Sequence, residues 1–497
     1  MGIRGLTLFL SLAFFPIVHA AVNCSKTTLD LDVGMATDLS ASKLQRLERM
    51  KLIYNDIREL RGLIANPKQM PASFYKRCYE IKNKAFSQHA RNAHQNLSDR
   101  ADFHALLGDY LFLMGKKSDS LGSYDRAATQ DPRNADYKLK AFELFQGIEA
   151  DRIRALPTKS ERVRATEEFK LKIITRLNAI LETQGVPPRV RSQTYVYKAL
   201  ALATDDRFAE AEQSWLSALK EMPSNTTALA QLSKFYLTKL KRPDKAVPHL
   251  RRLSQEKPDK ENFINWIQAA YESKDHHEVL SASNMALKKN PSEEEFKAYK
   301  AWALIHFERY DEAKKLSANF ESSLPKNEIA REARAKLKSI GAADLADSSP
   351  GQAISLLKEA IALFPDSEEF RVQLANVIVS HAKSRNFSPK DTIKKDFDYA
   401  ISNMARVLIK KELSSHVAEL GTTLYAFSSN PARGRGLCDK LSKDRLNTAD
   451  HIINCAYIYK ASKHDSKAQA LLDKGLQDPK YKSQRERMLR AMGDIGI

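Results

Sequence analysis

Residues 195–223 read YVYKALALATDDRFAEAEQSWLSALKEMP and contain two short runs in which apolar side chains recur every three or four positions. That spacing places the apolar side chains on one face of a helix, so each run predicts a short amphipathic helix. Pro223 follows the second run and marks a turn, because proline does not continue a helix easily. The stretch therefore predicts one helix–turn–helix unit.

The same unit occurs four times in succession. Matching landmarks recur in each copy: Pro223, Pro258, Pro291 and Pro325, preceded by Ala211, Ala246, Val279 and Ala313. The prolines lie 35, 33 and 34 residues apart. A period near 34 that holds two short helices is typical of an α-solenoid, in which each helix pair buries its apolar face against its neighbours.

The unit resembles the tetratricopeptide repeat (TPR). It has that family's spacing at eight positions: Tyr195, Ala199, Leu202, Phe208, Ala211, Trp215, Ala218 and Pro223. The small residues Ala199 and Ala211 fall where the two helices of such a repeat cross. The resemblance implies an all-α fold, a right-handed α-solenoid of helix–turn–helix repeats, and a binding role whose partner it does not specify.

We divide the chain into six parts by its signal-like start and by how closely each later segment matches the repeat pattern. They are a signal peptide (1–20), an N-terminal cap containing a helical hairpin (21–99), the first TPR-like units with one irregular member (100–190), a regular array (191–365), divergent TPR-like repeats (366–480) and a C-terminal capping helix (481–497). Within the cap, residues 23–37 show no clear period, so we expect an irregular lead-in there.

Residues 1–20 have the features of a secretory signal. Arg4 precedes an apolar run over residues 6–18, and Val18-His19-Ala20 offers small residues for cleavage before Ala21. The alternative is a lipid-modified amino terminus at Cys24, for which Asn23 is a poor fit. No other stretch approaches 18 consecutive apolar residues, so we expect an exported, periplasmic or secreted protein without a transmembrane span in its mature form.

The chain is basic, with 80 Lys and Arg against 61 Asp and Glu, for a formal charge of +19. Removing Arg4 with the signal lowers this charge to +18, an excess that favours acidic partners such as an acidic envelope polymer. The basic residues are dispersed, as on solvated helix faces. We expect no nucleic-acid partner, because the chain has an export signal and no recognisable reading module.

The four cysteines permit two disulfides in an oxidising compartment. Proximity favours Cys24 with Cys78, and the predicted packing of adjacent helices favours Cys438 with Cys455. The alternative is buried free thiols. We expect no metal site, because the chain has no CxxC and no close cluster of Cys and His.

No catalytic motif is present: HExxH, GxSxG, the phosphate loop and GxGxxG are absent. His276-His277-Glu278 is the nearest approach to a metal cluster, but adjacent helical positions point about 100° apart. Lytic transglycosylases also have a helical superstructure, but their glutamate motif is not found here. We therefore expect neither an enzyme nor a cofactor.

In the TPR family the first helices of the repeats line a concave groove. Register places nine residues at groove positions: Val196, Leu200, Gln231, Phe235, Ile264, Gln268, Tyr271, Trp302 and His306. The Lys and Asn that clamp a terminal carboxylate in some members are missing. A partly apolar, aromatic lining suits an extended or helical protein segment. Alternatively, these side chains simply pack within a tightly wound superhelix.

These features favour an exported scaffold that binds a protein segment, within a cell-envelope assembly. A second hypothesis is a factor in envelope polysaccharide export or remodelling, which would bind an acidic polymer through the basic surface. The sequence predicts no oligomeric state.

Overall fold

The computed structural model describes residues 24–37, 42–65, 71–384, 391–410, 412–441 and 448–496. The predicted signal peptide, residues 1–20, lies outside these ranges. The described chain consists of helices joined by turns and contains no strand. The predicted all-α repeat fold is confirmed. The right-handed sense of the solenoid stays a prediction.

The chain forms two compact units, Met1–Leu232 and Ser233–Ile497. The boundary falls inside the segment 191–365, which the sequence pattern treats as one regular array. The first unit begins with α1 (Lys26–Thr37), α2 (Lys43–Ala65) and α3 (Ala72–Leu97). Three helix pairs follow: α4 (Ala101–Leu113) with α5 (Lys117–Gln130), α6 (Ala135–Ala155) with α7 (Lys159–Leu181), and α8 (Pro188–Thr204) with α9 (Phe208–Glu221).

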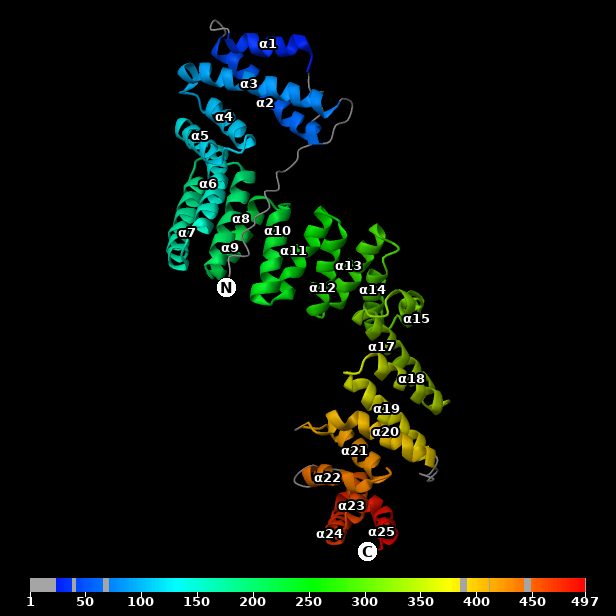
Figure 1. Ribbon diagram of the computed structural model, residues 1–497. Coiled ribbons are helices and arrows are strands. Elements are labelled where there is room, and N and C mark those ends of the chain that lie inside the picture. Colours follow the sequence, from blue (N-terminus) through cyan, green and yellow to red (C-terminus); the bar gives the residue numbers. More distant parts are fainter. Residues whose placement is uncertain are drawn as a thin grey trace. The chain divides into compact units, whose positions relative to one another are not determined.

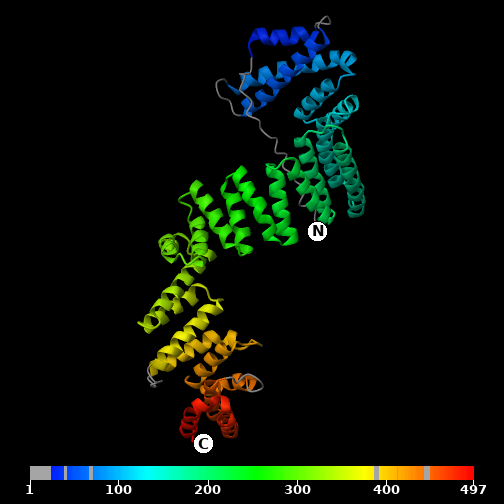
Figure 2. The same cartoon turned by 180° about the vertical axis from the view of Figure 1, so that it is seen from behind.

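The second unit continues the succession of pairs from α10 (Thr226–Phe235), which crosses the boundary and ends in a π-helical turn, η1 (Tyr236–Leu240). Its further elements are α11 (Pro243–Glu256), α12 (Lys260–Glu272), α13 (His276–Lys289), α14 (Glu294–His306), α15 (Tyr310–Ser317), α16 (Phe320–Ser323), α17 (Glu328–Leu345), α18 (Pro350–Leu363), α19 (Glu368–Ser384), α20 (Asp391–Leu408), α21 (Ser415–Ala426), η2 (Pro431–Gly434), α22 (Arg435–Leu441), α23 (Ala449–Ala461), α24 (Asp465–Gln477), η3 (Pro479–Gln484) and α25 (Arg485–Asp494). Helices α11 to α14 lie side by side, each against the next (Figures 1 and 2).

Small residues let the helices of a pair approach. The landmarks Ala211, Ala246, Val279 and Ala313 are all fully buried, as is Ala199. In α4, a Cβ added at Gly108 would lie 2.8 Å from ring atoms of Tyr124 in α5. Glycine is therefore required at Gly108 for this ring to pack against the α4 backbone.

A left-handed residue ends the first helix of six repeats. These residues are Gly115, Asp206, Lys241, Lys274, Glu308 and Lys463, with φ between 54° and 77°. In the typical case the next N–H bonds back to a carbonyl five residues earlier, as from Asp275 to Ala270 at 2.9 Å and from Arg309 to Leu304 at 3.0 Å. This is the Schellman stop, which satisfies the last carbonyls of a helix and turns the chain sharply.

One repeat contains an extra residue. In η1 the Arg242 N–H bonds to the Tyr236 carbonyl at 2.9 Å, six residues back rather than five. A π-helical turn inserts one residue into a helix without ending it. The insertion accounts for the 35-residue spacing between Pro223 and Pro258.

The N-terminal cap differs from the predicted irregular lead-in followed by a hairpin, because residues 26–37 form the helix α1. A disulfide between Cys24 and Cys78, with Cα atoms 5.9 Å apart, fastens its start to α3. Lys82 of α3 is fully buried and donates to Asp32 of α1 at 2.8 Å. The prediction of an irregular segment was wrong because contacts with α3, rather than an apolar period, hold this helix.

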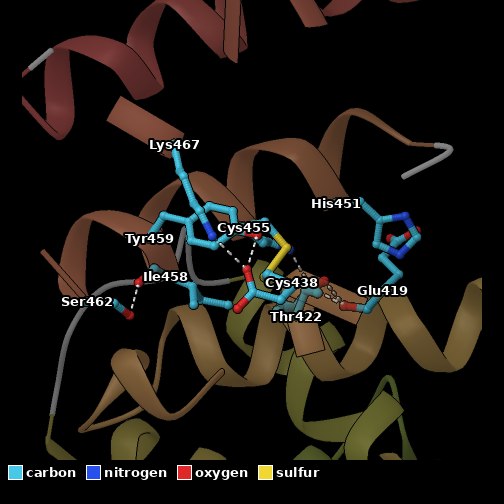
Figure 3. Close-up of a disulfide and its surroundings, with 12 residues drawn as sticks. Glu419, Thr422, Cys438, His451, Cys455, Ile458, Tyr459, Ser462 and Lys467 are labelled. Atoms are coloured by element: carbon cyan, nitrogen blue, oxygen red, sulfur yellow. Dashed lines mark hydrogen bonds and ion pairs between the residues drawn. A yellow bond between two sulfur atoms is a disulfide. The ribbon is translucent and has the colours of Figure 1, made fainter. Parts of the chain in front are cut away.

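The second disulfide joins Cys438 of α22 to Cys455 of α23, with Cα atoms 5.6 Å apart. Figure 3 shows it beside Tyr459 and Lys467, with His451 farther along α23. Both pairings are those that the sequence favours. The terminal segment consists of η3 and α25 rather than one helix, with Tyr481 and Met488 buried. Pro479 begins this tighter 3₁₀ turn, since its ring restricts the backbone there.

Candidate partner-binding site

Side chains from three successive first helices of the second unit meet on one surface, which we call the α12–α14–α17 face. The Tyr271 hydroxyl of α12 donates to a carboxylate oxygen of Glu332 in α17 at 3.0 Å. Between them lies α14, whose Tyr299 and Trp302 rings have centroids 6.1 Å and 4.7 Å from the Tyr271 ring. The face is therefore built by stacking repeats and exists in no single helix pair.

The sequence of α12 orients its side chains. Phe263, Trp266 and Ile267 are buried against neighbouring helices, which leaves Gln268 exposed on another side. The Asp259 carboxylate caps the helix by accepting from the Asn262 N–H at 2.9 Å. The Trp266 indole N–H donates to Glu278 of α13 at 3.0 Å and fixes the rotation of α12 against its partner.

A pocket of about 440 Å³ lies beside this face, between η1 and α12. Its lining consists of Leu237, Lys241, Pro243, Asn265, Gln268, Ala269 and Glu272. The π-helical turn and the left-handed Lys241 shape one side of it. The amides of Asn265 and Gln268 offer donors and acceptors that suit a peptide backbone.

The nine predicted groove residues are not equally accessible. Val196 and Phe235 are only 4% and 3% exposed, so their side chains pack in the interior. Leu200, Gln231, Ile264 and Tyr271 are partly exposed, and Gln268 and His306 are exposed. Val196, Leu200 and Gln231 belong to the first unit and the remaining six to the second. That the nine form a partner-binding groove stays a prediction.

Two of the nine predicted groove residues, Trp302 and His306, lie close to His276, for which the sequence suggested only a possible role as a metal ligand. The His276 ring centroid is 4.7 Å from that of Trp302 and 3.4 Å from that of His306. Burial, followed by the charge of His306, holds the pKa of His276 below its usual range. Among the described residues no three His, Cys, Asp or Glu side chains form a metal-binding group.

The tyrosines of the face remain hydrogen-bond donors at neutral pH. Burial raises the pKa of Tyr271, and the nearby carboxylates Glu332 and Glu328 raise it further. Burial also raises the pKa of Tyr299, with further contributions from Glu295, Glu272 and Glu328. The electrostatic environment of both hydroxyls is therefore acidic.

The stacked pairs, the small residues at their crossings and the regular period together decide the fold. It is an all-α fold of stacked helix–turn–helix repeats. No family model matches the chain, and no curated protein matches its sequence. Similar solved structures include a tetratricopeptide repeat protein from Parabacteroides merdae, at 14% identity and a TM-score of 0.32, covering 54% of this chain and 98% of that one. Yeast Tom70 is similar at 13% identity and a TM-score of 0.25, covering 90% and 95%.

A third similar structure is the C-terminal part of a TPR repeat-containing protein from Cytophaga hutchinsonii, at 13% identity and a TM-score of 0.30, covering 54% of this chain and 98% of that one. At these values the likenesses support no inference about a TPR partner. None of the described helices has an apolar stretch long enough to cross a bilayer.

Proposed function

We propose that this chain is an exported TPR scaffold, and that it binds an extended or helical segment of another protein within a cell-envelope assembly. The binding surface in this proposal is the α12–α14–α17 face with its adjoining pocket. The observation that carries the proposal is the pocket itself, because the amides of half-buried Asn265 and exposed Gln268 line it beside aromatic side chains from two successive repeats. Such a surface suits a peptide backbone and its apolar side chains.

Two observations support export. The first is the signal-like segment 1–20. The second is the pair of disulfides, Cys24–Cys78 and Cys438–Cys455, since disulfides persist mainly in oxidising compartments. A non-catalytic role is part of the proposal and rests on the missing catalytic motifs in the sequence.

Site-specific photocrosslinking in the native cells tests the proposal. A photoreactive residue at Gln268, in the pocket, is expected to capture one specific protein. The same residue at Asn284, exposed on the neighbouring second helix α13, is the matched control and is expected to capture none. Equal capture at both positions, or capture at neither, would contradict the proposed surface.

An acidic envelope polymer is the second candidate partner, and the formal charge of +18 that remains after removal of the signal with Arg4 from the +19 chain favours it. It would bind basic residues away from the α12–α14–α17 face. Retention on an acidic glycan resin that falls with salt and is unchanged by Gln268→Arg would favour this function over the first.

A further inference from the structure

Polar contacts, rather than an apolar face, hold the helix α1 on the N-terminal cap. Among the described side chains of α1, residues 28–35, only Asp32 is buried, and Leu29 is partly buried. Leu31 and Val33 are 49% and 44% exposed. The helix lies against α3 (Figure 1). Because α1 buries little apolar surface, its attachment depends on the charged groups beneath it.

Three cations and two carboxylates meet where α1 contacts α2 and α3. Lys82 of α3 donates to Asp32 of α1 at 2.8 Å and pairs with Asp56 of α2 at 2.7 Å. Arg49 of α2 pairs with Asp32 as well. Arg46 of α2 is 5% exposed and donates to a backbone carbonyl of α1 at 3.4 Å. The contact therefore has an excess of positive charge, and a further cation there would be repelled.

His89 of α3 is a fully buried titratable group in the same contact. Its Nε2 donates to the backbone carbonyl of Asp32, with 3.1 Å between nitrogen and oxygen. Its Nδ1 has no hydrogen-bond partner among the described residues. Protonation at Nδ1 would therefore bury a donor without an acceptor and add a charge beside Arg46 and Arg49. Burial and these two arginines lower the pKa of His89, and Asp32 compensates only in part.

We propose that α1 is an acid-sensitive strap, which is docked on α3 at neutral pH and detaches in mild acid. The disulfide between Cys24 and Cys78 keeps its start joined to α3 after detachment. Detachment uncovers Arg46, Arg49 and Lys82, so the cap presents these cations to solvent in acid and covers them at neutral pH. The inference does not depend on the proposed binding surface.

The direction of the pH response follows from the two states of His89. In the detached state the imidazole is exposed and has its ordinary pKa of about 6.5, whereas in the docked state the pKa is lower. Above this range both states are neutral, and docking does not depend on pH. Below it the detached state binds the proton first, so docking weakens as the pH falls. One proton raises the equilibrium constant for detachment by up to about tenfold between about pH 7.5 and about pH 5.5.

Hydrogen exchange in the full, disulfide-bonded chain tests the inference. Exchange is measured between about pH 7.5 and about pH 5.5, where carboxylates are ordinarily ionised, and is corrected for the intrinsic rate. The opening constant of α1 is expected to rise by up to about tenfold toward the acid end of this range. Helices α8 and α9 of the same unit are the internal reference and are expected to show no comparable rise.

His89→Gln is the decisive variant, because the glutamine amide can still donate to the Asp32 carbonyl but does not titrate. The opening constant of α1 in this variant is expected to be independent of pH. His104→Gln is the matched control, since His104 of α4 is also buried and lies 2.8 Å from a backbone carbonyl. It is expected to keep the acid response of the wild type.

Three results would overturn the strap. They are an opening constant of the wild-type α1 that does not change with pH, a rise that persists in His89→Gln, and an equal rise in α1 and in the reference helices. If His89→Gln does not fold, an NMR titration of the His89 imidazole in the wild type replaces it. A midpoint below about 6.5 is then expected, and a midpoint at or above this value would overturn the inference.

Discussion

The Tyr271 hydroxyl of α12 donates to the Glu332 carboxylate of α17 at 3.0 Å and thereby joins helices from two non-adjacent repeats across α14. Tyr271→Phe keeps the ring contacts with Trp302 and removes only the donor. We expect the variant to lose about 1 kcal/mol of unfolding free energy, measured by urea denaturation. Tyr310→Phe is the control, and an equal loss in both variants would show that the bond stabilises nothing.

Substitution by alanine is expected to lower the unfolding free energy at Gly108 and to raise it at Gly122. At Gly108 the added methyl group meets the Tyr124 ring, and the cost is about 1–3 kcal/mol of unfolding free energy. At Gly122, exposed in α5, the methyl group meets nothing within 4 Å, so alanine stabilises the helix by up to about 1 kcal/mol. Urea midpoints of the two variants that shift in the same direction would contradict this packing.

The left-handed conformation of the residues between paired helices slightly lowers the unfolding free energy when the residue is not glycine. Glu308 has a φ of 59°, which glycine adopts without a steric penalty. Glu308→Gly is therefore expected to raise the unfolding free energy by about 0.5–1 kcal/mol, while Asp311→Gly, three residues later in α15, lowers it by about 1 kcal/mol. Thermal unfolding of both variants gives the comparison, and a destabilised Glu308→Gly protein would be inconsistent with the assigned turn.

Asp32 is expected to hold α1 on the cap. Asp32→Ala removes one of the two carboxylate partners of the fully buried Lys82, which keeps Asp56, and also the partner of Arg49, so α1 should lose about 2 kcal/mol of local stability. Hydrogen exchange in α1 measures this loss as faster exchange. Asp30→Ala, at an exposed position two residues earlier, should leave the exchange unchanged. Retained protection in Asp32→Ala would mean that the disulfide and the bonds from Arg46, Arg49 and His89 to backbone carbonyls of α1 are enough to hold the helix.

His451 is expected to make the second unit less stable in mild acid. It is fully buried, and burial lowers its pKa in the folded protein. The unfolded chain therefore binds the proton more readily, and the unfolding free energy falls as pH drops from about 6.5 toward the lowered value, by at most about 1.4 kcal/mol per pH unit. Urea unfolding at several pH values should show a smaller slope for His451→Gln and an unchanged slope for His416→Gln. An unchanged slope in His451→Gln would contradict the buried neutral state.

The period of the sequence predicted the helix pairs well, because small residues such as Ala211 and Ala246 must recur wherever two helices cross. The sequence did not predict the left-handed turns, although they recur with the same period. Lys274 and Glu308 occupy positions at which glycine is the usual sign of such a turn. Helix α1 was missed because a tertiary contact between Asp32 and Lys82 holds it, and no local pattern predicts such a contact.

The candidate site was only partly predictable for a similar reason. Register placed Gln268 and Tyr271 on one helix, where both are at least partly exposed, but it also selected Phe235, which is only 3% exposed. Tyr299 and Glu332 were missed because their meeting with Tyr271 depends on how three repeats stack. Periodicity identifies the face of a helix, and the stacking decides which of its side chains remain accessible.

The most direct test of the account is the dissociation constant of the protein segment captured at Gln268, measured by calorimetry with the purified chain. The account predicts that Gln268→Arg weakens binding by tenfold or more, about 1.4 kcal/mol, because the larger cationic side chain fills the pocket beside the acidic face. It predicts no change for Asn284→Arg on α13. Equal dissociation constants for the wild type and the Gln268→Arg variant would contradict the central claim that this face is the binding surface.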